Sequence, residues 1–227
     1  MVEPAANREL LRALGKLARG LSALFWGLPA ALLVGVGTAL GGWLRPFNIA
    51  PALITTGLLL YGLVQIGAFQ KQERPWRQAL NRARLVALIN FGLSPFLFWW
   101  SRMPGNAFFT AIVGLLAVTG LLFLINLNLV LLRLGAMLPD ETLRQETRQF
   151  TQLNRVLLIG LLVVVGACVF LLQLPDLPPM MMFVLANLQR FSLTTLLLLV
   201  LLPVSMTMAL LWKTKEVILE SVFSPRG

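Results

Sequence analysis

The chain has 227 residues, of which 58% are hydrophobic and only 12% are charged, and its mean hydropathy is +0.82. A soluble fold of this size must expose much of its surface to water, and a disordered chain is polar and highly charged, so both classes are excluded. The 19 basic and 9 acidic residues give a net charge of +10. In a soluble protein this charge would favour nucleic acid as a partner. Here the positions of the basic residues favour an anionic membrane surface instead, and we expect no nucleic-acid partner.

Six apolar stretches are long enough, or nearly long enough, to cross a bilayer core of roughly 30 Å, which takes about 20 helical residues. None of them contains aspartate, glutamate, lysine or arginine. The third has 16 residues and is expected to recruit flanking residues or to thin the bilayer locally. The sequence therefore predicts an all-α, polytopic membrane protein with six transmembrane helices. The predicted spans are Leu21–Leu44, Ile49–Phe69, Leu85–Trp100, Ala107–Leu132, Val156–Leu174 and Phe191–Trp212.

The basic residues are sorted between the two sides of the membrane. Sixteen of the 19 fall before the first span, after the second, after the fourth and after the sixth. Only Arg45, Arg102 and Arg190 fall on the other side. Loops that carry more lysine and arginine stay in the cytoplasm. We therefore expect an inner-membrane protein with both termini in the cytoplasm.

The outer connections divide the spans into pairs. Two of them, at 45–48 and 102–106, are very short, and the third, at 175–190, is longer and rich in proline. Short connections join antiparallel neighbours, so the spans are expected to form three hairpins. A similar spacing of basic residues before each hairpin allows an internal repeat, although the positive-inside rule alone also explains that spacing. The predicted organisation is a basic amphipathic helix at 1–20, hairpins at 21–69, 85–132 and 156–212, a basic linker helix at 70–84, a polar linker helix at 133–155 and a tail at 213–227.

The cytoplasmic linkers combine apolar and basic stripes at helical spacing. Helices of this kind lie in the membrane interface, with apolar residues toward the lipid and cations on the phosphates. Two arginines seven residues apart share one face and lie about 10.5 Å apart along the axis. We expect these residues to bind the headgroups of membrane lipids. The residues concerned are Arg12, Lys16, Arg19, Arg77, Arg84, Arg148 and Arg155.

The third linker differs, because it is mostly polar. Asp140 and Glu141 follow Pro139 at a predicted helix start, where acidic side chains complement the helix dipole, and Asp140 can pair with Arg144 one turn later. A polar helix standing off the membrane would be a docking site for another membrane protein subunit, through Asp140, Glu141 and Arg144. The alternative is a solvated extension of the fifth span.

Residues that could carry out chemistry are scarce. The chain has no histidine and one cysteine, and the predicted spans contain no ionisable Asp, Glu, Lys or Arg. We therefore expect no enzyme, no metal site, no cofactor and no proton-coupled transport. The uncharged polar residues of the inner half could line a cavity open to the cytoplasm, but interhelical hydrogen bonding is the favoured interpretation. They are Gln65, Asn90, Asn126, Asn128 and Thr207.

Two functions remain. The expected one is a non-catalytic accessory or scaffold subunit that binds anionic lipid through its linkers and associates with other membrane protein subunits. The alternative comes from the six spans, the basic first helix and the segment Leu174-Pro-Asp-Leu-Pro-Pro179, which are loosely similar to permease subunits of ABC exporters. This resemblance implies a transporter part that works with a nucleotide-binding subunit. The long polar linker at 140–155 departs from the permease pattern.

Overall fold

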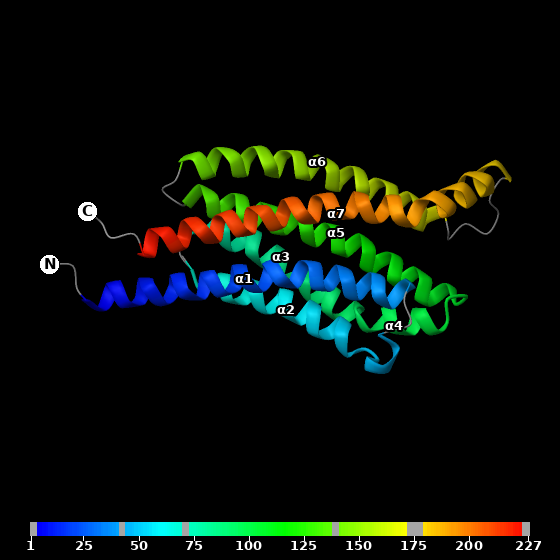
Figure 1. The fold of residues 1–227 in the computed structure, drawn as a ribbon, viewed down its shortest axis with the longest axis horizontal. Helices are drawn as coiled ribbons and strands as arrows, with labels where there is room; N and C mark the ends of the chain where they lie inside the picture. The colour runs from blue at the N-terminus through cyan, green and yellow to red at the C-terminus, as the bar shows by residue number, and fades with distance from the viewer. Residues whose placement is uncertain (1–3, 41–43, 70–72, 138–140, 172–178, 224–227) are drawn as a thin grey trace.

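The computed structural model describes residues 4–40, 44–69, 73–137, 141–171 and 179–223. Throughout this part the chain is helical, without a β-strand, which confirms the all-α prediction. The long helices run beside one another along the long axis of a bundle (Figure 1). They are α1 (Pro4–Leu40), α2 (Ala50–Ile66), α3 (Arg74–Leu93), α4 (Pro95–Arg102), α5 (Ala107–Met137), α6 (Glu141–Leu171) and α7 (Pro179–Phe223), with a short 3-10 helix, η1 (Arg45–Phe47), after α1.

Five helical segments of the described chain are long and apolar enough to cross a membrane, which indicates a multi-pass membrane protein. Helix α2 is also apolar, but with 17 residues it is about 25 Å long, slightly less than a bilayer core. The short third stretch predicted from the sequence lies within one of the five segments, since α3 and α4 together reach from Arg74 to Arg102. The five segments are Leu11–Ala39, Arg74–Arg102, Ala107–Met137, Arg144–Ala167 and Leu198–Glu220.

The helices continue across the boundaries expected between linkers and spans. Helix α1 passes residue 20 without a break, α3 passes residue 84, and α6 passes residue 155. The described residues of these linkers are helical, and they belong to the longer helices α1, α3, α5 and α6 instead of forming separate ones. The reason is visible in α1, where Leu17, Leu21, Leu24 and Leu28 are all buried and keep one helical face across the expected boundary.

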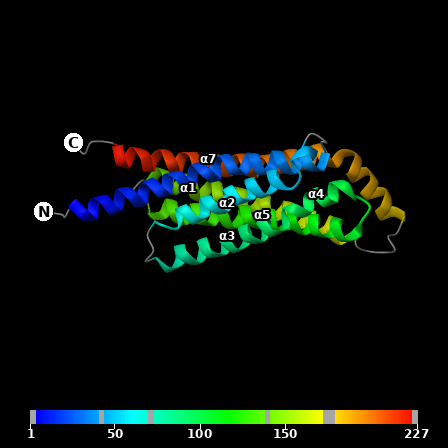
Figure 2. The ribbon, with the colours of Figure 1, turned by 90° about the horizontal axis from the view of Figure 1, so that it is seen from below.

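The helices form a closed ring in chain order. Each of α1, α2, α3, α5, α6 and α7 contacts the next, and α7 returns to contact α1. The start of α1, the end of α2, the start of α3, the end of α5, the start of α6 and the end of α7 lie at one end of the bundle (Figures 1 and 2). We call this the basic end. Its cationic residues include Arg12, Lys16, Arg19, Arg77, Arg82, Arg84, Arg133, Arg144, Arg148, Arg155, Lys213 and Lys215.

The distribution of apolar and polar side chains is not that of a soluble bundle. Leucines fill much of the interior, but fully buried Asn154 and Thr207 lie there too. Outside, large apolar side chains are openly exposed, among them Trp26 at 68% and Val156 at 69%. Apolar surface of this extent requires a covering, and lipid acyl chains provide one without a loss of backbone hydrogen bonds in a helical protein. The surface agrees with the multi-pass membrane fold.

Helices α1 and α2 approach each other closely at glycines. A Cβ atom on Gly20 would lie 2.7 Å from the carbonyl oxygen of Gly62, and one on Gly62 would lie 2.8 Å from Cγ of Leu24. A Cβ atom on Gly27 would meet Leu59 at a similar distance. Small residues at a helix crossing let the backbones pack closely, which is a main source of helix association in lipid. This contact brings the first two helices together at the basic end.

Candidate functional site

A groove lies at the basic end, between the last turns of α5 and the first turns of α6. Its larger part is a cavity of about 570 Å³ with three arginine side chains and one glutamate on its wall. The size falls within the range of small-molecule sites. The lining residues are Leu132, Arg133 and Ala136 of α5 with Glu141, Arg144, Gln145 and Arg148 of α6.

A smaller cavity of about 250 Å³ adjoins the first, because Leu132 and Arg148 line both. It adds Arg155, the polar side chains Asn128, Thr151 and Gln152, and the apolar Ile125 and Leu129. We call the two cavities together, with these lining residues, the arginine groove. It combines a strongly cationic part with an apolar wall on α5.

The positive charge of the groove is largely uncompensated. Within the described chain, Arg133, Arg148 and Arg155 have no ion-pair or hydrogen-bond partner, and all three are exposed. Arg144 donates a hydrogen bond to the carbonyl oxygen of Ala136 over 3.4 Å. Guanidinium groups bind phosphate with two parallel hydrogen bonds, so this arrangement suits a phosphate-bearing anion.

Beneath the groove, Asn154 of α6 connects three helices. Its Nδ2 donates to Oδ1 of Asn128 on α5 at 3.3 Å and to Oγ1 of Thr207 on α7 at 3.0 Å. It also lies 3.2 Å from the carbonyl oxygen of Pro203, and Asn128 Nδ2 itself donates to Thr207. Asn128 and Thr207 therefore form hydrogen bonds between helices, which was the favoured interpretation for these two side chains. Asn126 faces another direction, as its spacing predicts, and bonds within α5 to Leu122.

Asn154 was not among the residues expected to form hydrogen bonds between helices. A signal was present, because Thr147, Thr151, Asn154, Leu158 and Leu161 recur at intervals of four and three and are all buried. This stripe marks the face of α6 that packs into the bundle. The expected lipid residues Arg148 and Arg155 lie beside it and face the groove.

The other expected lipid-binding residues do not line the groove. Arg12, Lys16, Arg19 and Arg77 are exposed on α1 and α3. Arg84 is only half-exposed, and its guanidinium donates to the carbonyl oxygen of Leu63, at 3.0 and 3.3 Å, and to that of Val64 at 3.2 Å.

A cation is favourable at the carbonyl end of a helix, and Leu63 accepts from Arg84 in addition to the backbone N–H of Gly67 at 3.3 Å. Arg84 thus joins α3 to the end of α2, a role that its position before an apolar run does not reveal. Trp76 strengthens the same junction, since its buried Nε1 donates to the carbonyl oxygen of Phe69 at 3.2 Å.

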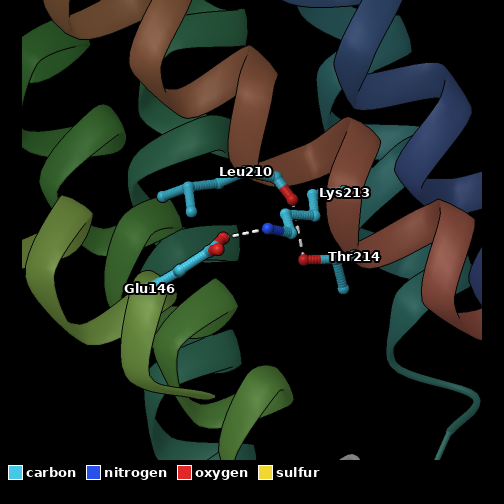
Figure 3. Close-up of polar contacts among 4 residues, drawn as sticks. All are labelled: Glu146, Leu210, Lys213 and Thr214. Carbon is cyan, nitrogen blue, oxygen red and sulfur yellow. Dashed lines mark hydrogen bonds and ion pairs between the residues drawn. The ribbon is translucent and has the colours of Figure 1, made fainter. Parts of the chain in front are cut away.

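The three residues expected to dock a partner have different positions. Asp140 lies outside the described residues. Glu141 and Arg144 are exposed and line the larger cavity of the arginine groove. Sequence reasoning also missed an ion pair nearby, in which Lys213 of α7 donates to Oε2 of Glu146 on α6 (Figure 3). Their separation of 67 residues explains why no local pattern predicted the pair.

In the part of the chain that the structure describes, no three His, Cys, Asp or Glu side chains gather where they could hold a metal ion. No known protein family matches the chain, and neither the curated proteins nor the solved structures contain a match. The function of this protein is therefore inferred from its own residues and their arrangement.

Proposed function

We propose that this protein is a non-catalytic subunit of a larger complex in the cytoplasmic membrane, and that its basic end binds anionic lipid. In this proposal it crosses the membrane six times, as three hairpins, with both termini in the cytoplasm. The exposed apolar side chains of the outer surface and the five long apolar segments support the membrane location. Helix α2 is counted as the sixth span, because the bilayer can thin to meet a short apolar helix.

The orientation is supported by the charge at the basic end. If α2 crosses the membrane, the described helix ends that carry 14 of the 19 basic residues all face one side. The cytoplasmic leaflet is the negatively charged one in most membranes, and lysine or arginine near it gains about 1 kcal/mol per residue. The positive-inside rule leads to the same assignment.

One observation carries the lipid-binding part of the proposal, namely the arginine groove. Arg133, Arg144, Arg148 and Arg155 converge on two adjoining cavities, and Glu141 is the one acidic side chain among their described lining residues. Cationic pockets between membrane helices on the cytoplasmic side are typical sites for acidic lipid headgroups.

The scaffold part of the proposal is supported by the outer face of the first turns of α6. Phe150 and Leu153 are 42% and 57% exposed, beside the exposed polar residue Gln149. Apolar side chains within a polar rim are typical of protein interfaces. Glu141 and Arg144 lie on the same helix and are open to a partner.

The test is purification of the tagged full chain from its native membrane in mild detergent, with mass spectrometry of both proteins and lipids. The proposal predicts recovery of a larger membrane protein and enrichment of anionic over zwitterionic phospholipid. Recovery of the partner should fall for Phe150→Ser with Leu153→Ser, and not for the control Leu88→Ser, which changes an exposed leucine of α3. A lone monomer would contradict the scaffold role, and a co-purified nucleotide-binding subunit would favour the permease alternative.

A further inference from the structure

We infer that the arginine groove is a specific site for one molecule of a phospholipid whose headgroup carries two phosphate groups. This inference rests on the proposed membrane location and orientation. It goes further, because it distinguishes one stoichiometric site from a general attraction between a basic surface and an acidic membrane.

The groove has two cationic parts, one in each cavity. Arg144 and Arg155 are 11 residues apart, which is close to three full turns, so they share one face of α6 at an axial distance of about 16 Å. Arg148 lies between them and lines both cavities. Arg133 and Arg144 can take one phosphate in the larger cavity, Arg155 can take the other in the smaller cavity, and Arg148 can reach either. A headgroup with a single phosphate would leave one part unoccupied.

Thr151 provides an observation that is independent of charge. Its side chain is 94% buried, its Oγ1 has no hydrogen-bond partner within the described chain, and it lines the smaller cavity between Arg148 and Arg155. A buried hydroxyl without a partner is unfavourable, and such groups in native proteins call for an explanation. A phosphate or ester oxygen in the smaller cavity would accept its hydrogen bond.

The apolar wall distinguishes a lipid from a free anion. Ile125, Leu129 and Leu132 recur at intervals of four and three on one face of α5, and all three line the smaller cavity. They form the α5 wall of the cavity that Arg148 and Arg155 line on α6, and acyl chains would lie against this wall. Glu141 lies in the larger cavity only and leaves a net positive charge there. A lipid fills both the cationic and the apolar part, whereas pyrophosphate fills only the cationic part.

The experiment is native mass spectrometry of the delipidated full-length protein in detergent. The probes are cardiolipin with two phosphates, phosphatidylglycerol with one, and zwitterionic phosphatidylcholine, with inorganic pyrophosphate as a competitor. The variants are Arg148→Gln, which changes the residue common to both cavities, and Thr151→Val, which removes the hydroxyl but keeps the shape. Arg82→Gln is the matched control, because it removes one exposed charge at the basic end away from the groove.

The inference predicts one tightly held cardiolipin per chain, with an affinity about tenfold or more above that for phosphatidylglycerol, the factor expected for one additional charge-assisted contact. Arg148→Gln should abolish this difference, Thr151→Val should reduce it without lowering the melting temperature, and Arg82→Gln should preserve it. Equal affinity for both acidic lipids, with Arg148→Gln no worse than Arg82→Gln, would overturn the site but leave the proposed lipid binding intact. A lack of preference for any acidic lipid would overturn both. Full displacement of cardiolipin by equimolar pyrophosphate would overturn the assignment to a lipid.

Discussion

Asn154 on α6 donates a hydrogen bond to Thr207 on α7 over 3.0 Å, and both side chains are fully buried. Because Asn154 also bonds Asn128 on α5, one amide fixes how three helices face each other. Apolar packing between helices in lipid is weakly directional, since leucine makes similar contacts with lipid and with protein. These hydrogen bonds therefore favour one rotation of α5, α6 and α7 about their own axes.

Replacement of Asn154 by leucine should destabilise the bundle. The change leaves Asn128 and Thr207 with one partner fewer inside an apolar environment, at an expected cost of about 1 to 2 kcal/mol. Thermal unfolding of the purified protein in detergent measures the change. Asn126→Leu is the control, since the amide of Asn126 bonds only within its own helix and should matter less. Equal melting temperatures for the two variants would show that the network contributes nothing specific.

Arg84 should be required to hold the end of α2 against α3. Arg84→Gln loses the hydrogen bonds to the carbonyl oxygens of Leu63 and Val64, and the last turn of α2 is expected to exchange its amide hydrogens faster. Hydrogen exchange read by mass spectrometry locates the effect. The exposed Arg77 on the same helix provides the control Arg77→Gln, which should leave exchange in α2 unchanged. An unaltered exchange pattern in Arg84→Gln would contradict this role.

Gly67 offers a second test of the same junction. A Cβ atom at this position would collide with the Arg84 guanidinium and would lie 2.9 Å from Cδ2 of Leu80. Gly67→Ala should therefore displace Arg84 and reproduce the faster exchange of the end of α2, although no charge is removed. If the amide hydrogens in the last turn of α2 exchange as slowly in Gly67→Ala as in the unaltered chain, the guanidinium does not lie over this turn.

The glycine contact between α1 and α2 predicts opposite effects of alanine at two positions. Gly62→Ala places a Cβ atom 3.0 Å from the backbone oxygen of Gly20, so the helices must separate, at a cost of about 1 to 3 kcal/mol. Gly35→Ala on α1 meets nothing within 4 Å and should be neutral or stabilising, because alanine favours helix over glycine by about 1 kcal/mol. Melting temperatures of both variants in the same detergent test the prediction. A smaller loss for Gly62→Ala than for Gly35→Ala would refute it.

The ion pair between Glu146 and Lys213 should contribute little. Both side chains are more than 40% exposed, and exposed pairs stabilise proteins by about 0.2 to 1 kcal/mol. A double-mutant cycle with Glu146→Gln and Lys213→Met separates their coupling from other effects, and the coupling should fall as salt is raised. A coupling above this range that is insensitive to salt would mean that the pair is shielded from solvent.

The helices were predictable from the sequence because apolar length and the placement of charge are strong local signals. The uncharged stretches predicted the long helices, and Pro75 falls in the first turn of α3, where proline is favoured. The spacing of Asn126 and Asn128 was enough to predict that the two side chains face different ways.

Contacts between distant helices were less predictable. Arg84 sits before an apolar run as the other linker arginines do, and only the position of α2 shows that it binds carbonyl groups there. Trp76 occupies a position typical of an interfacial tryptophan, yet it is buried, because α2 ends beside it. The arginine groove is likewise formed by two helices, α5 and α6. Arg133 lies on α5, and its position in the groove depends on how α6 packs beside it, which no local pattern predicts.

The membrane topology is the claim on which lipid binding and subunit assembly both depend, and cysteine accessibility measures it most directly. In a Cys168→Ser background, Asn106→Cys between α4 and α5 and Gln145→Cys on α6 each provide one exposed thiol. We expect a membrane-impermeant maleimide to label the cysteine at 106 in spheroplasts without permeabilisation, and the cysteine at 145 only after permeabilisation. Labelling of position 145 in intact spheroplasts, with position 106 protected, would contradict it.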